Sequence, residues 1–279
     1  MNSVAPAADV PSALFTPPSR HFRRRLAIFA AIGAFLVAAS AALKFQPWLL
    51  FTDFHYLVRL AGEMLPPRIE LLWTKPSLYS SVAETIAMAL LGTLGGASIA
   101  LALALLAAAN TTPHPLLRTV VRFGFGAERA TPNFVVLLVL LIAVGFGPFA
   151  GMLALTIGSI GMFGKLFADA IEQVDPAPIE AIESVGAGRW HVIRYAVVPQ
   201  VLPSVVANGF YAFDVNLRAA IALGVYGGGG LGFELQLAMK VLRYQDVLAL
   251  VLLVLVMVTL MERVSDFLRR RILGSTASL

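Results

Sequence analysis

Long apolar runs alternate with short polar connections along this chain. Residues 26–43 and 86–109 contain no charge, and each run is long enough to cross a hydrocarbon core of about 30 Å as one helix. Residues 134–164 are also uncharged, but as one helix they would be roughly 46 Å long at 1.5 Å per residue. Gly145-Phe146-Gly147-Pro148 lies inside this run and predicts a break, because glycine and proline favour turns. We therefore expect two spans there, joined by a tight outer turn.

Two more apolar runs, residues 199–224 and 246–263, complete a prediction of six transmembrane helices. The composition agrees, since 58% of the 279 residues are hydrophobic, 13% are charged and the mean hydropathy is +0.82. Soluble globular chains carry about 25% charged residues. The expected fold class is therefore an all-α polytopic membrane protein, with a disordered cytoplasmic tail at residues 1–19 and a second tail at residues 272–279.

The first apolar run follows a basic cluster that includes Arg23 and Arg25. Ala39-Ser40-Ala41, at its far end, mimics the cleavage site of a signal peptide. The length of the run and the number of spans that follow favour an uncleaved first helix.

Aromatic residues, among them Trp48 and Trp73, are frequent in the segment between the first and second spans, residues 44–78. Such side chains suit the headgroup zone of a membrane, either as an interfacial helix or simply as packing. We divide the chain accordingly into a first region at 20–78 and a transmembrane core at 79–271.

The basic residues are unequally distributed between the two sides that six spans define. Thirteen of the 21 Lys and Arg residues lie on the side of both termini and of residues 175–199, here called the polar loop, and six lie on the opposite side. Cytoplasmic loops carry an excess of Lys and Arg, so we expect an N-in, C-in topology with the polar loop in the cytoplasm. The net charge of +5 then reflects topology, and we expect no nucleic-acid partner.

Several chemical classes are disfavoured by the residues themselves. The chain has no cysteine, which excludes disulfides, thiolate catalysis and Cys-bound metals. Its four histidines lie far apart in different segments (His21, His55, His114, His191). An enzyme inside the membrane would need a nucleophile with its base, or metal ligands, within the spans. We therefore expect no catalytic residue, no metal site and no cofactor on this chain.

The polar loop has the pattern of a helix–turn–helix. Asp175 suits the N-cap of a first helix and Pro176 suits its first position. Gly186 begins a Gly-Ala-Gly turn, and residues 190–198 predict a second short helix. Pro199 is expected to end that helix and to begin the fifth span.

The fifth span contains polar groups that membranes disfavour, since a central Asp or Arg costs about 2.5–3.5 kcal/mol on insertion scales. Asp214 and Arg218 are four residues apart and share a helix face with Tyr211. They form either a neutralising pair or part of a path for an anion, with Asp214 holding Arg218 in place, and both interpretations can hold together. Asn216 is included among the pathway candidates, although it points to nearly the opposite face and is expected to bond a neighbouring helix.

A glycine-rich run follows the fifth span, and four of its residues are candidates for a gate or turn (Gly227, Gly229, Gly230, Gly232). Exposed N–H groups in such a run can form an anion nest. We prefer a re-entrant turn packed between helices. A dinucleotide site is not expected, because no strand precedes these glycines.

Small residues elsewhere indicate close helix packing. Gly92 and Gly96 form one small-xxx-small ridge, and Gly147 and Gly151 form another. Glu84, near the outer end of the second span, is expected to reach headgroups or water.

The polar loop resembles the EAA loop in permeases of ABC importers, where Glu-Ala-Ala, three residues, Gly, nine residues and Ile-x-Leu-Pro follow one another. Here Ile182 replaces the second Ala, Ala196 stands at the Ile position and Val198 at the Leu position. The resemblance implies a type I ABC-importer permease fold, with the loop inserting into a groove on the ATPase subunit. The residues it implies for coupling to the ATPase are Glu180, Ala181, Ile182, Gly186, Val198 and Pro199.

From about Pro66 onward the chain is similar to permeases of phosphonate-type importers. Pieces that carry this similarity include Arg129-Ala130-Thr131-Pro132, Gly164-Lys165-Leu166, Asp214-x-Asn216-x-Arg218 and the stretch from Gly224 to Gly232. The sequence departs from that pattern in three places: Asp214 replaces a Glu, Gly228 an Ala, and Gly158 stands where a His is frequent.

The resemblance implies a subunit of a bacterial plasma-membrane importer for phosphonate, phosphate or phosphite. Its partners would be membrane lipid, a second permease copy in a homodimer, two cytoplasmic ABC ATPases and an extracytoplasmic substrate-binding protein. ATP and Mg²⁺ would belong to the ATPase. An importer for another solute, such as methionine or polar amino acids, is the alternative.

Overall fold

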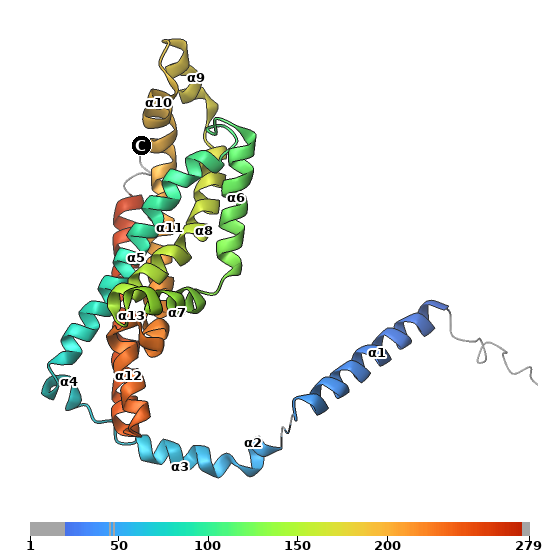
Figure 1. Ribbon diagram of the computed structural model, residues 1–279, viewed down its shortest axis with the longest axis vertical. Coiled ribbons are helices and arrows are strands. Elements are labelled where there is room, and N and C mark those ends of the chain that lie inside the picture. The colour runs from blue at the N-terminus through green and yellow to red at the C-terminus, as the bar shows by residue number, and fades with distance from the viewer. Residues whose placement is uncertain (1–19, 45, 47, 275–279) are drawn as a thin grey trace, which may run out of the picture. The chain divides into compact units, whose positions relative to one another are not determined.

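The computed structural model describes residues 20–44, 46 and 48–274 (Figure 1). Every regular element in this described part is a helix, which confirms the expected all-α class. The predicted tail at residues 1–19 lies outside it, as do the last five residues of the predicted tail 272–279. The chain forms two compact units, residues 1–59 and 60–279.

The first unit contains α1 (Arg20–Ala42), α2 (Leu49–Thr52) and the start of α3 (Phe54–Met64). Residues 24–42 of α1 are apolar and long enough to span a membrane, as the first hydrophobic run predicts. The side chain of Phe35 on α1 is 72% exposed and that of Phe51 on α2 is 84% exposed. Apolar surface exposed to this extent is compatible with a lipid environment.

The second unit is built around the long helices α5 (Ser77–Ala107) and α8 (Pro148–Glu172), which pack together along their lengths. Gly92 and Gly96 make the approach possible: a Cβ added at Gly96 would lie 2.5 Å from the Cβ of Ser159, closer than real contacts. The predicted small-residue ridge on α5 is thus confirmed. The second predicted ridge is only half correct, because Gly147 instead caps the N-terminus of α8 with φ 140°.

The third predicted span differs from the structure. The break at Gly145–Pro148 is present, but it leaves α7 (Asn133–Val144) only 12 residues long, too short to cross about 30 Å. Residues Pro115–Ala130, expected to be part of a cytoplasmic connection, form the amphipathic helix α6, which packs against α8 and is bent by 91° from α7. The two helices together have the apolarity of one broken span.

The chain between α8 and the fifth span also corrects a prediction. It forms α9 (Pro176–Ser184), α10 (Arg189–Val192) and a wide π-helical segment, η2 (Ile193–Val197), which continues directly into α11 (Val198–Leu223). Pro199 therefore does not end a helix. Its missing N–H falls in the first turn of α11, where a helix tolerates proline.

The C-terminal part returns along the bundle. The π-helical segment η3 (Gly224–Gly228) leads to α12 (Gly230–Lys240), and α13 (Tyr244–Gly274) packs against both α11 and α12. A short helix, α4 (Leu71–Thr74), precedes α5. The α12 helix was not predicted, because residues 230–240 lie between the fifth and sixth predicted spans and begin with the glycine-rich run that favours a turn.

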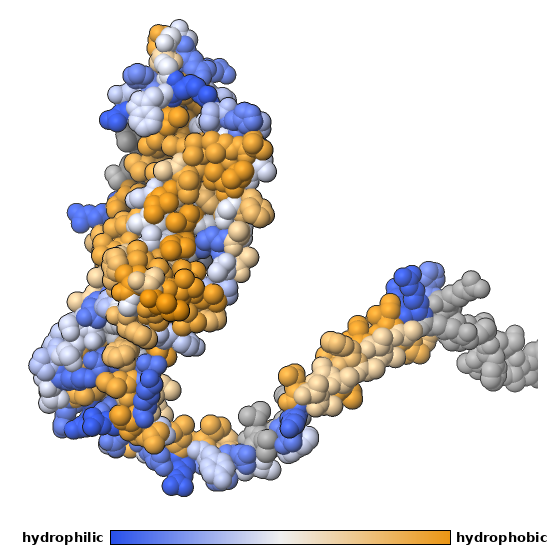
Figure 2. All heavy atoms as spheres, viewed as in Figure 1, coloured by the Kyte–Doolittle hydropathy of each residue, from blue (hydrophilic) through white to orange (hydrophobic). Residues whose placement is uncertain are grey.

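Within the described residues, five helical stretches are long and apolar enough to span a membrane, and α6 with α7 provides a sixth if the bent pair counts as one span. The middle of the second unit is a band of hydrophobic surface, whereas hydrophilic residues gather at both of its ends (Figure 2). The six predicted spans thus correspond to five long apolar helices and, when the bent pair counts as one span, to a sixth that is assembled differently from the expectation.

Candidate functional site

The polar loop contains α9 and α10 and lies at one end of the second unit (Figure 1). The Asp175 carboxylate accepts a hydrogen bond from the Ala177 N–H at 3.0 Å, so it caps α9 as predicted. Gly186 adopts φ 80°, which favours glycine, and its N–H donates to the Glu183 carbonyl at 2.9 Å. This glycine closes the turn after α9.

Two sets of contacts attach the polar loop to the membrane-spanning helices. The Gln200 side chain on α11 accepts from the Asp175 N–H at 2.9 Å. Arg189 donates to the carbonyls of Thr111 and Thr112, each at 3.3 Å, in the connection between α5 and α6. These contacts join the polar loop directly to α11 and to the connection between α5 and α6.

The loop exposes side chains that its own chain does not cover. No residue of α9 is buried, and Glu180 and Ala181 are exposed while Ile182 is half-buried. Val185 and Trp190 are 81% and 66% exposed. Large apolar side chains that remain exposed in a polar loop are compatible with contact to another protein.

The polar residues of the fifth span are arranged differently from the expectation. Arg218 forms an ion pair with Glu262 of α13, not with Asp214. Asp214 accepts a hydrogen bond from Ser265, also on α13, at 3.0 Å. The physical reason is that α13 packs along α11 and offers partners across the interface, which a sequence pattern within one helix cannot reveal.

Asn216 lies on the buried side of α11 and is only 5% exposed. Its amide nitrogen donates to the hydroxyls of Thr93 at 2.8 Å and Ser159 at 2.9 Å. Both hydroxyls donate in turn to carbonyls of their own helices, at Ala89 and Leu155. Asn216 therefore joins α5, α8 and α11 through a satisfied network, as its helix face predicted, whereas Tyr211 is 57% exposed on another face.

The glycine-rich run forms a tight turn against the start of α5. Gly227 and Gly229 have φ 105° and 82°, values that L side chains rarely adopt. The Gly230 N–H donates to the Glu84 carboxylate at 3.1 Å, and the Leu231 N–H donates to the Thr85 hydroxyl at 2.9 Å. These two amides are engaged within the protein, which favours the packed turn over an anion nest.

Gly232 serves a different purpose in the same turn. A Cβ at this position would lie 2.0 Å from the Ile221 carbonyl oxygen, so only glycine permits the approach of α12 to the end of α11. Glu84 is the residue whose role was misjudged. It lies well inside α5 and caps the N-terminus of α12, where the helix dipole favours an acid.

Comparison with known proteins identifies the class. The family model described as "Binding-protein-dependent transport system inner membrane component" matches residues 100–274, which include the polar loop, α11 and the glycine-rich turn. The chain belongs to this family. It is a multi-pass permease subunit of an ABC importer in the plasma membrane, not an enzyme.

Two relatives narrow the comparison. The chain is 38% identical over 260 residues to the phosphate-import permease protein PhnE of Mycolicibacterium smegmatis, a match that covers 91% of this chain and 48% of that protein. It is 40% identical to the phosphite transport system permease protein PtxC of Stutzerimonas stutzeri, covering 77% of each. The chain thus spans about half the length of the first relative and about three quarters of the second.

Solved structures confirm the fold. An inward-facing MetNI methionine ABC transporter aligns with a TM-score of 0.62 at 21% identity, covering 72% of this chain and 97% of that chain. This likeness establishes the architecture of a type I ABC-importer permease, as the sequence predicted.

Proposed function

We propose that this chain is the permease subunit of an ATP-driven importer for phosphonate or a related phosphorus oxyanion, such as phosphate or phosphite. The observation that carries the proposal is its identity of 38% and 40% to permeases named for phosphate and phosphite, over 91% and 77% of this chain. Both named solutes are compact phosphorus oxyanions. The methionine transporter, at 21% identity, supports the fold and not the alternative solute.

The proposed assembly contains a second copy of this chain, two ATPase subunits and an extracytoplasmic binding protein. ATP and Mg²⁺ would be held by the ATPases. The unit's band of hydrophobic surface supports contact with lipid and with the second permease (Figure 2). The topology in this assembly is N-in, C-in, with α9 and α10 in the cytoplasm, as the distribution of basic residues indicates.

Coupling to the ATPase is proposed to run through Glu180, Ala181, Ile182 and Gly186 in the exposed part of the loop, and through Val198 and Pro199 at the start of α11. The contacts of Gln200 and Arg189 support this route, because they join the loop to two spans. Closure of the ATPase pair would displace α9, and the unbroken helix from α10 through η2 to α11 would carry that displacement into the membrane.

The translocation path is proposed to follow the polar side of α11, with Tyr211, Asp214 and Arg218. The Arg218 side chain is 57% exposed although it is paired with Glu262, so an arriving anion would compete with a carboxylate already in place. Asn216 belongs to the structural network on the other side of α11. The packed glycine turn at Gly227, Gly229, Gly230 and Gly232 is proposed as the outer gate, since it joins α11 to α12.

The test is uptake of labelled phosphate in cells that express or lack this chain together with its partner subunits, with excess methylphosphonate as competitor. Expression-dependent uptake that methylphosphonate blocks is the expected result. Uptake that ignores the competitor would identify a phosphate-only importer. If neither labelled phosphate nor labelled phosphonate enters, the proposed solute is wrong, and methionine and polar amino acids are tested next.

A further inference from the structure

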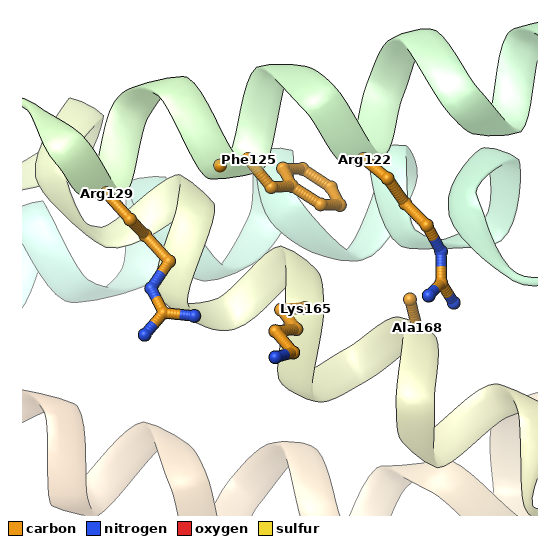
Figure 3. A pocket seen from close by; sticks show the side chains of 6 residues that line it. Arg122, Phe125, Arg129, Lys165 and Ala168 are labelled. Atoms are coloured by element: carbon orange, nitrogen blue, oxygen red, sulfur yellow. The ribbon is translucent and has the colours of Figure 1, made fainter.

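A cavity of about 270 Å³ lies between α6 and α8, apart from the polar residues of α11. Its lining is Arg122, Phe125, Gly126 and Arg129 from α6, with Lys165 and Ala168 from α8. Figure 3 shows the side chains of Arg122, Arg129 and Lys165 on the same side of these two helices. Three cations and no acid therefore border one volume.

The three cations differ in what neutralises them. Arg122 contacts the Glu172 carboxylate at 2.8 Å and lies 3.9 Å from that of Asp169. Arg129 and Lys165 form no ion pair with any residue that the structure describes. The remaining nearby acid, Glu128, turns its buried carboxylate toward Gly161. Arg129 and Lys165 thus border the cavity without an ion pair in the described part of the chain, and Glu128 interacts with Arg129 only through its longer-range charge.

The position of Lys165 along α8 indicates what its charged side chain faces. It lies seven residues before the end of α8, or roughly 10 Å at 1.5 Å per residue, in the half of the bundle that leads to α9. Ionisable side chains in membrane helices almost always face the bundle interior or a water-filled cavity. By this rule we expect Lys165 and Arg129 to face the bundle interior or a water-filled cavity rather than lipid.

The apolar wall of the cavity is held by close packing. The Phe125 ring lies against Gly164, where an added Cβ would be 2.3 Å from the ring. The ring is 5% exposed and separates Arg122 from Arg129 along α6 (Figure 3). The cations are therefore set on a rigid wall, and the cavity volume does not depend on a mobile loop.

We propose that Arg129 and Lys165 form a binding site for a phosphate-type oxyanion in the cavity between α6 and α8. A guanidinium and an ammonium converging on one volume match the charge and the hydrogen-bond acceptors of such an anion. The anion has two conceivable sources, the transported solute and a lipid headgroup, and the solute is the one inferred. The identity of that solute rests on the proposed function; the existence of the anion site does not.

The natural absence of cysteine allows a direct test in membranes that contain the complete transporter. Single variants Lys165→Cys and Arg129→Cys are treated with an anionic and a cationic methanethiosulfonate reagent, and each rate is divided by that of a free thiol. Leu166→Cys is the matched control, because Leu166 is 38% exposed at the same depth and does not line the cavity.

At Lys165→Cys and Arg129→Cys we expect the normalised rate of modification to be about tenfold higher for the anionic reagent than for the cationic one. We also expect excess inorganic phosphate to lower the rate for the anionic reagent severalfold, whereas chloride of equal ionic strength should not. Leu166→Cys is expected to show neither effect. Equal behaviour at Lys165→Cys and Leu166→Cys would overturn the site. If the modification rates change only when phosphatidylglycerol in the membrane is exchanged for phosphatidylcholine, the bound anion is a lipid headgroup and not the transported solute.

Uptake by the unaltered transporter, measured in parallel, separates this inference from the proposed function. If phosphorus oxyanions are not taken up but phosphate still protects Lys165→Cys, the anion site stands and the proposed solute falls. If uptake occurs and phosphate does not protect either cysteine, the proposed function stands and the proposed anion site is wrong. Using both positions keeps the test decisive if one variant does not insert.

Discussion

Two regions of the second unit use polar and apolar residues in opposite ways. Where α5, α8 and α11 meet, the buried Asn216 donates hydrogen bonds to the buried hydroxyls of Thr93 and Ser159. At the α9–α10 end, Val185 and Trp190 are exposed and have no cover from this chain. The comparison shows that the three-helix interior is complete within one chain, whereas the loop presents a surface of the kind that partners cover.

The two regions also differ in how closely their backbones are packed. At the α5–α8 contact, a single methyl group would collide with the opposite helix, as at Gly96. At Gly186 and Gly188, an added Cβ would meet nothing within 4 Å. Substitutions in the first region should therefore act on folding, and those in the second on coupling.

The largest effect should follow Gly96→Leu. The new side chain would displace Ser159 and the carbonyl of Thr156, and overpacking of this kind typically costs about 1–3 kcal/mol or more. We expect little folded protein, measured as the monodisperse fraction in size-exclusion chromatography after detergent extraction. Gly209→Leu is the control, since its Cβ would meet nothing within 4 Å, and equal yields of the two variants would contradict the role assigned to the α5–α8 contact.

The next largest effect should follow Gly186→Pro, which addresses the other region. Proline requires φ near −65°, and Gly186 has φ 80° and donates its N–H to Glu183. We expect ATP-driven uptake to fall at least about tenfold while membrane insertion is unchanged.

Gly188→Pro is the matched control for this turn. Gly188 has φ −72°, which proline adopts without strain, so uptake should remain close to normal. Full transport by Gly186→Pro, or equal loss in both variants, would argue against a coupling role for the geometry of the turn.

A smaller effect is expected from Arg218→Gln, which leaves Glu262 without its partner. We expect uptake to fall severalfold, because the variant removes a positive charge from the proposed path and leaves a carboxylate there. Arg218→Gln combined with Glu262→Gln should restore protein yield, since no unpaired charge remains, without restoring uptake. Normal uptake by the double variant would reduce the ion pair to a structural role.

The smallest effect is expected from Asn216→Leu. Interhelical hydrogen bonds in membranes contribute about 0.6 kcal/mol on average, so loss of the bonds to Thr93 and Ser159 should destabilise the chain by about 1–2 kcal/mol. Thermal unfolding in detergent measures this change. Asn208→Ala is the control, because among the described residues the Asn208 amide donates to Ser204 on its own helix. An equal shift of the unfolding temperature in both variants would show that the bonds of Asn216 between helices add no stability.

Prediction from the sequence succeeded where one helix or one turn decides the outcome. The apolar runs at 86–109 and 246–263 became α5 and α13, although α5 begins before its run and ends at Ala107, and α13 extends beyond its run at both ends. Asp175 became the N-cap of α9 because its donor is only two residues away. The turn at Gly145–Pro148 formed because its two glycines adopt positive φ and proline begins the next helix.

The sequence therefore determined the all-α class, the apolar spans, the helix–turn–helix of the polar loop and the packing face of Asn216, since these depend on periodicity, capping and local backbone preference. Only the tertiary structure decided that Arg218 pairs with Glu262, that Glu84 caps α12, and that Arg129 and Lys165 border one cavity. In each case the partners lie more than 30 residues apart in the chain, and their meeting depends on how two helices pack. A small-residue pattern can indicate that a helix packs closely, but the choice of partner helix depends on pairs of surfaces, and no pattern within one segment encodes it.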